Sequence, residues 1–119
     1  MEDSLNFFSC QVLYQRALFL KNVRADYDGA EELFKRVLTL EPRDATALCN
    51  YGLLLQHVRN DAAGAQDLYR RALALPPDTL SDEEHVSLRY SYGSLCQDVL
   101  HDVRQAQLHF EAALVLAPE

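Results

Sequence analysis

The chain lacks the features that would make it a membrane-spanning, secreted or disordered protein. Its 119 residues include only four glycines and four prolines, and no stretch is rich in Ser and Gly. No apolar run is long enough to cross a bilayer, because polar residues interrupt the longest candidate, residues 7–20. The first residues are acidic, where a secretory signal needs basic ones. We therefore expect one folded, soluble domain in the cytoplasm, with no membrane partner.

Cysteine is also scarce, and its distribution excludes two further classes of protein. Cys10, Cys49 and Cys96 are odd in number and widely separated, and none belongs to a Cys-x-x-Cys pair. A disulfide scaffold and a zinc knuckle both need closely spaced or evenly paired cysteines. We expect three buried or half-buried thiols that pack between helices as small apolar groups.

Negative charge is unevenly placed along the chain, which has a net charge of −7. Residues 1–59 carry eight acids and seven bases, whereas residues 60–119 carry ten acids and four bases. An acidic half repels phosphate backbones, so we expect no nucleic acid partner. A basic peptide is one candidate partner, and the alternative is a solvated acidic face that keeps the protein soluble.

One sequence pattern occurs three times, and each repeat ends at a proline. The repeats begin at Asp26, Asp61 and Asp102 and end at Pro42, Pro77 and Pro118. The matched positions between are Ala30, Phe34, Val37 and Leu38; Ala65, Tyr69, Ala72 and Leu73; and Ala106, Phe110, Ala113 and Leu114. A period of about 20–50 residues is typical of solenoids, whose units bury apolar faces only against their neighbours. We therefore expect an all-α solenoid of three antiparallel helix pairs, over residues 10–42, 45–77 and 82–118.

Local signals predict where several of these helices begin. Apolar residues spaced three and four apart predict a helix over 45–57, with Asp44 as its cap, and Asp61 can cap the helix that follows. Ser81 and Glu84 fit a capping box, so the fifth helix should begin about one turn early. We expect Gly52 and Gly93, like Ala17 in the first repeat, to allow close helix contacts, facing the alanines that begin each repeat's second helix.

The three phased repeats resemble the tetratricopeptide repeat (TPR) family over nearly the whole chain. The second repeat is the best match, with Leu48, Tyr51, Gly52, Leu55, Ala65, Tyr69, Ala72 and Pro77. The resemblance implies a right-handed superhelix whose first helices line a concave groove for peptides or partner helices. The groove positions that it implies are Gln11, Tyr14, Leu18 and Lys21; Thr46, Cys49, Asn50, Leu53 and Gln56; and Ser87, Tyr90, Ser91, Ser94 and Gln97.

This groove should be polar and neutral, with Tyr14 and Tyr90 as amphipathic anchors for a peptide. One subset of the family holds the C-terminal carboxylate of chaperones with lysines, an arginine and asparagines, of which only Asn50 is matched here. A carboxylate clamp needs cations, so a chaperone tail is not an expected partner. We expect Asn50 to form hydrogen bonds between helices instead.

Residues arranged for catalysis or metal binding are not apparent. The four histidines, His57, His85, His101 and His109, form no His-Glu-x-x-His motif, and we expect all four on the surface. Cys49 and His57 share one predicted helix but lie about 12 Å apart along it, too far for proton transfer. We expect no enzyme, no cofactor and no metal site.

The sequence thus predicts a non-catalytic protein–protein interaction module, a scaffold or adaptor that binds a peptide or partner helix in its groove. One alternative is a self-assembling subunit that uses the apolar last helix, around Phe110 and Leu114, to form a homo-oligomer. Another is the targeting or regulatory part of a larger enzyme. Because Glu119 directly follows the last closing proline, we expect either a longer chain or another molecule to cover that helix.

Overall fold

The computed structural model describes the backbone of residues 2–117 and the side chains of residues 8–117. Pro118, the last closing proline, lies outside this range. All regular secondary structure in the described part of the chain is helical, which confirms the all-α prediction. None of the described helices combines the length and the apolar composition needed to cross a membrane.

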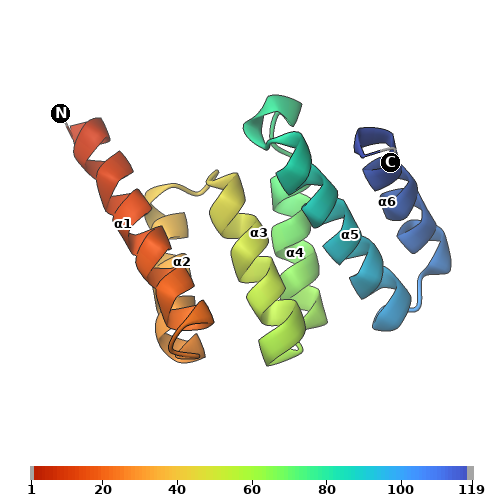
Figure 1. Cartoon of the computed structure of the whole chain (residues 1–119), viewed down its shortest axis with the longest axis horizontal. Coiled ribbons are helices and arrows are strands. Elements are labelled where there is room, and N and C mark those ends of the chain that lie inside the picture. Colours follow the sequence, from red (N-terminus) through yellow and green to blue (C-terminus); the bar gives the residue numbers. More distant parts are fainter. Residues whose placement is uncertain (1, 118–119) are drawn as a thin grey trace.

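Six α-helices and two short helical segments of other types follow one another along residues 2–117. They are α1 (Glu2–Asn22), α2 (Tyr27–Leu40), α3 (Ala45–Leu54), the π-helical η1 (Leu55–Arg59), α4 (Ala62–Leu73), the 3₁₀-helical η2 (Pro77–Thr79), α5 (Asp82–Asp98) and α6 (Val103–Leu116). Figure 1 shows the helices arranged in a row, with α1 and α6 at opposite ends. The closest packing joins α1 to α2, α3 to α4 and α5 to α6, and α2 and α4 also contact the helix that follows them.

The same turn precedes α2, α4 and α6, and its geometry is nearly identical each time. The turn places one residue in the left-handed region, namely Ala25, Asn60 and His101, with φ of 52°, 55° and 54°. The aspartate after it accepts a hydrogen bond from the backbone N–H three residues later, at 3.0, 2.9 and 3.1 Å. Such a bond satisfies one N–H group at the start of the helix. The predicted caps Asp61 and Asp44 are both confirmed.

Two helix ends have distinctive geometry: the start of α5, which the sequence predicts, and the end of the helix that begins at Ala45, which it does not. Helix α5 begins at Asp82 with the capping box formed: Glu84 N–H donates to Ser81 Oγ at 3.1 Å, and Ser81 N–H donates to Glu84 Oε1 at 3.2 Å. The helix predicted over 45–57 instead continues to Arg59, with its last five residues π-helical. A π-turn holds one residue more than an α-turn, so this segment accommodates extra chain before the next turn.

Glycine is needed at two helix crossings because an aromatic ring lies against it. A Cβ atom on Gly52 would lie 2.5 Å from a ring carbon of Tyr69, and one on Gly93 would lie 2.7 Å from a ring carbon of Phe110. The prediction of close packing is therefore confirmed, but the nearest atoms belong to these rings rather than to the expected alanines. Tyr69 is fully buried and packed against its neighbours, so a Cβ atom on Gly52 would force its ring or the helices to shift.

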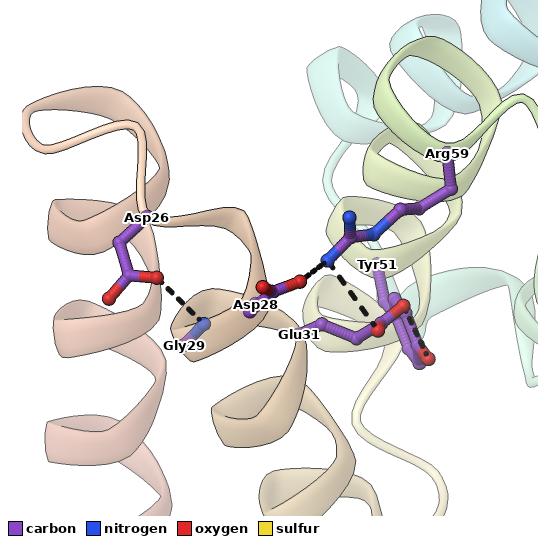
Figure 2. Close-up of polar contacts among 6 residues, drawn as sticks. All are labelled: Asp26, Asp28, Gly29, Glu31, Tyr51 and Arg59. Carbon is purple, nitrogen blue, oxygen red and sulfur yellow. Dashed lines mark hydrogen bonds and ion pairs between the residues drawn. The ribbon is translucent and has the colours of Figure 1, made fainter.

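A polar cluster joins α2 to α3 and η1 (Figure 2). Arg59 pairs with Asp28 and lies 3.9 Å from the Glu31 carboxylate, which also accepts a hydrogen bond from the Tyr51 hydroxyl at 3.2 Å. The Tyr51 ring stacks on Phe34 of α2, with ring centres 6.0 Å apart. Tyr51 therefore connects the two helices through both its ring and its hydroxyl.

Candidate functional site

A cleft of about 260 Å³ lies between α3 and α5, with Tyr69 of α4 also contributing to its wall. The remaining lining residues are Thr46, Cys49, Asn50 and Leu53 of α3, and Glu83, Glu84, Ser87, Leu88 and Ser91 of α5. The cleft is smaller than most sites for organic cofactors, but its volume suits one or two side chains of a bound peptide. It is the candidate functional site.

The early start of α5 places two carboxylates in this cleft. Glu83 and Glu84 lie in the extra first turn, which the capping box on Ser81 begins. Glu84, Ser87 and Ser91 are spaced three and four residues apart, so they share one face of the helix. The same capping box that stabilises the end of the helix therefore also brings charge to the cleft.

Hydrogen bonds connect α1, α3 and α5 along the cleft wall. Asn50 Nδ2 donates to the Tyr14 hydroxyl at 2.8 Å and to the Thr46 carbonyl at 2.9 Å. The Thr46 hydroxyl donates to Glu84 Oε2 at 3.1 Å. The expected role of Asn50 as a bridge between helices is confirmed. The Asn50 amide nitrogen therefore already donates hydrogen bonds within the protein. The charged side chains that line the cleft are those of Glu83 and Glu84.

The electrostatics of the cleft disfavour any further negative charge. Burial, together with the carboxylates of Glu84 and Asp44, raises the pKa of the Cys49 thiol to about 12. Burial and the same carboxylates likewise raise the pKa of Tyr14 to about 12. Burial also acts to raise the pKa of Glu84, but hydrogen bonds from Ser81 and Thr46 outweigh it and leave that pKa below its usual value. Glu84 is thus ionised near neutral pH, whereas the Cys49 thiol stays protonated.

Six of the predicted groove residues line this one cleft: Thr46, Cys49, Asn50, Leu53, Ser87 and Ser91. Gln11 and Tyr14 line a smaller adjoining cavity of about 90 Å³ with Thr46. Leu18 packs into the core between α1 and α2, and Lys21 is half-buried. Gln56 accepts a hydrogen bond from the buried Tyr69 hydroxyl at 2.6 Å, so its side chain serves the helix packing.

Three predicted groove residues of the third repeat lie elsewhere or carry no contact that assigns them to the cleft. Tyr90 is 64% exposed, with its ring 6.2 Å from that of Phe110, and it lines an apolar hollow on α5 and α6. Gln97 lines a second hollow beside it, and Ser94 is half-buried. The two expected anchors thus line different cavities: Tyr14 lines the small cavity beside the cleft, and Tyr90 lines the apolar hollow, which shares Glu83 and Ser87 with the cleft.

The charge of the cleft was missed by the sequence analysis, which expected a neutral groove. The sequence predicts only the capping role of Glu84, although the spacing from Glu84 to Ser87 and Ser91 carries the signal for its place in the cleft. An early helix start extends the same helical face by one turn, and that face continues into the cleft. The site is therefore acidic along its α5 wall.

The prediction that all four histidines lie on the surface is wrong for His109. This side chain is 6% exposed, stacks on Tyr92 with ring centres 4.1 Å apart, and has Nδ1 3.0 Å from the Arg89 guanidinium. Burial and the positive charge of Arg89 lower the pKa of His109. The repeat carries the missing signal, since Leu33 and Leu68 occupy the equivalent positions and both are buried.

The three thiols lie in surroundings that raise their pKa values, mainly through burial. Cys10 and Cys96 are buried and Cys49 is half-buried, all three as free thiols, which confirms that prediction. Burial, together with nearby carboxylates, raises the pKa of the Cys49 thiol, the opposite of what a nucleophile requires. Among the described residues, no three His, Cys, Asp or Glu side chains are grouped so that they could hold a metal ion.

Comparison with known proteins adds no assignment. No protein-family model matches the chain. No curated protein matches its sequence.

Proposed function

We propose that the chain is a tetratricopeptide-like solenoid of three helix pairs. The support is the repeated geometry: one left-handed residue, one aspartate cap and one small residue against the second helix recur in each repeat. The small residues Ala17, Gly52 and Gly93 are all buried at equivalent positions. Repeats that share turn and contact geometry stack in the same way, which produces a superhelix.

On this architecture, the chain acts as a non-catalytic interaction module that binds a basic peptide in the cleft between α3 and α5. The observation that carries this proposal is the pairing of Glu83 and Glu84 in a cleft whose lining residues include no Lys, Arg or His. A guanidinium group that enters the cleft would meet the Glu84 carboxylate, which hydrogen bonds from Thr46 and Ser81 already hold in position. The exposed Glu83 carboxylate and the Ser87 and Ser91 hydroxyls are further acceptors along the same wall. Such preorganised acceptors lower the cost of binding.

The same features favour a peptide over the other partners that an acidic helical protein could bind. Carboxylates in the cleft repel phosphate and the C-terminal carboxylates of other chains. A long basic side chain can place its charge at the carboxylates while its methylene groups contact Leu53 and Leu88. We therefore expect arginine or lysine in the bound peptide to determine specificity.

Selection from a random octapeptide library tests this function. The wild-type protein serves as bait, and the Glu83→Gln/Glu84→Gln protein serves as the counter-bait. Glutamine keeps the capping box and removes both charges, so the variant should fold normally. We expect the wild type to enrich peptides that contain arginine or lysine at a fixed position, and the variant to lose that enrichment.

Two outcomes would contradict the proposed function. Enrichment of acidic or wholly apolar peptides by the wild type would show that the carboxylates do not select the partner. Equal enrichment by both baits would place the binding surface outside the cleft. A matched control, Glu32→Gln, removes one exposed charge on α2 and should select the same peptides as the wild type.

A further inference from the structure

The two ends of the helix row expose apolar surfaces that the internal repeats keep buried. At one end, α1 exposes Val12 and Phe19, which are 66% and 49% exposed. At the other end, α5 and α6 carry two apolar hollows of about 540 and 330 Å³, both lined by Phe110 and Leu114. Leu114 is 62% exposed. Figure 1 shows that α1 and α6 lie at opposite ends of the molecule.

The internal repeats show which kind of surface covers each end. Val12, Arg16 and Phe19 of α1 correspond to Ala47, Tyr51 and Leu54 of α3, and to Leu88, Tyr92 and Leu95 of α5. In α3 and α5 these positions pack on the preceding helix pair: Tyr51 stacks on Phe34, and Tyr92 lies against Tyr69 with ring centres 5.6 Å apart. The exposed face of α1 is thus the face with which its counterparts dock.

The receiving surface is repeated in the same way. Phe34 and Val37 in α2, and Tyr69 and Ala72 in α4, are at most 2% exposed because the next helix covers them. The equivalent residues of α6 are Phe110 and Ala113, which are only half-buried. The outer face of α6 therefore carries, partly exposed, the residues that the next helix covers in α2 and α4.

The charges on α1 are opposite in sign to those that border the hollows on α5 and α6. Residues 8–24 of α1 and its turn contain three bases, Arg16, Lys21 and Arg24, and no acid. Glu83 borders one apolar hollow on α5 and α6, and Glu111 borders the other. The docking face of α1 thus combines the apolar Val12 and Phe19 with one base, Arg16, whereas each hollow on α5 and α6 is apolar with one acid at its border. These two surfaces are complementary, and one chain carries both.

A specific contact follows from the repeat. The Tyr51 hydroxyl donates to Glu31 of α2 at 3.2 Å (Figure 2), and Gln66 Nε2 of α4 donates to the Tyr92 hydroxyl at 3.3 Å. The next equivalent pair joins Arg16 to Gln107, whose side chain already donates to Glu111 at 3.0 Å. Arg16 would then lie over the Phe110 ring with the Glu111 carboxylate within reach.

We propose that a second copy of this chain docks its α1 on the outer face of α5 and α6, so that copies associate head to tail. The contact is heterologous, since each copy offers one α1 face and one α6 face. It therefore leaves a free face at both ends of every dimer, and assembly continues beyond two chains or closes into a ring.

Sedimentation velocity of two variants, each blocked at one end, tests the arrangement. Phe19→Asp blocks the α1 face and Leu114→Asp blocks the α6 face, and both side chains are exposed enough for the fold to tolerate the change. We expect the wild type to form species larger than dimers as its concentration rises, and each variant to be monomeric alone. An equimolar mixture should form dimers of one copy of each variant, through the single pair of intact faces.

Charge reversal in that mixture tests the register. Glu111→Arg in the Phe19→Asp protein and Arg16→Glu in the Leu114→Asp protein should each weaken the mixed dimer at least about tenfold, and together they should restore it. A matched control is Val115→Asp, one residue from Leu114, because its counterparts Thr39 and Ala74 are exposed within the chain. This variant should assemble as the wild type does.

Several results would overturn the proposal. A wild type that stays monomeric up to near-millimolar concentration would show that another molecule covers these faces. Dimers formed by either blocked variant alone would indicate a symmetric contact. A mixture without dimers, or charge reversals that do not compensate, would exclude the α1–α6 pairing.

Discussion

Replacing Arg89 and His109 together by leucine should stabilise the fold and remove part of its pH dependence. The pair occupies positions that Leu48 and Leu68 hold in the second repeat, where both leucines belong to one buried cluster. His109 Nε2 is buried without a hydrogen-bond partner, which costs about 1–3 kcal/mol of stability. Leucine at both positions removes that cost and also removes a partly buried charge.

The sign of the pH effect follows from the surroundings of His109. Burial and Arg89 lower its pKa in the folded state, and Arg70 and Asp102 are the other charged groups lining the adjoining cavity. In the unfolded chain His109 therefore takes up a proton at about pH 6.5, whereas in the folded protein it does so only at lower pH. The free energy of unfolding therefore keeps its full value above about pH 6.5 and decreases as the pH falls, because protonation of His109 favours the unfolded chain. The decrease is at most about 2 kcal/mol at pH 5.

Urea denaturation at about pH 7.5 and about pH 5 measures both effects in one experiment. Between these two pH values, the free energy of unfolding of the wild type should decrease by up to about 2 kcal/mol more than that of the Arg89→Leu/His109→Leu protein. His101→Asn is the matched control, since His101 is exposed and asparagine already occupies the same left-handed position at residue 60. That variant should keep the wild-type pH dependence. An equal loss of stability in the wild type and the double-leucine protein would show that His109 does not cause the pH dependence.

Three further predictions concern packing, capping and thiol chemistry. Gly52→Ala should destabilise the protein by about 1–2 kcal/mol, measured by urea denaturation, because the new methyl group would overlap the buried Tyr69 ring; a neutral or stabilising effect would mean that the helices separate freely. Asp61→Ala should cost about 1 kcal/mol through loss of the cap on α4, and unchanged stability would show that this bond contributes nothing. Cys49 should react with a disulfide reagent at neutral pH at least about tenfold more slowly in the folded protein than in urea, because its pKa is raised to about 12; similar rates would contradict the acidic cleft.

Helix starts were predictable because each depends on a few neighbouring residues. Asp44, Asp61 and the Ser81–Glu84 box signal their caps through side chains that bond within one turn, and the structure contains these bonds. The π-helical end of the helix after Leu54 has no such local signature. Its Leu55 and Val58 side chains belong to two different apolar clusters, a tertiary arrangement that a single helical pattern does not describe.

The candidate site was predictable on α3 but less so on α5. Thr46, Asn50 and Leu53 follow the periodicity of one regular helix, so their shared face could be assigned from spacing. To predict that Glu83 and Glu84 bring charge to the cleft, the helical face of Ser87 and Ser91 has to be continued through the extra first turn of α5. Whether a tyrosine such as Tyr90 faces the cleft or the outer hollow depends on how α5 rotates against α6, which only tertiary packing determines.

In the proposed function, the acidic cleft between α3 and α5 binds a basic side chain of a peptide. The most direct test is an NMR titration of the labelled protein with two octapeptides that differ only by arginine or its uncharged isostere citrulline. We expect the arginine peptide to shift the amide signals of Thr46, Ser87 and Ser91 and to bind more weakly at higher salt, and the citrulline peptide to bind at least about tenfold more weakly. Equal binding of the two peptides, or shifts confined to α1 and α6, would contradict it.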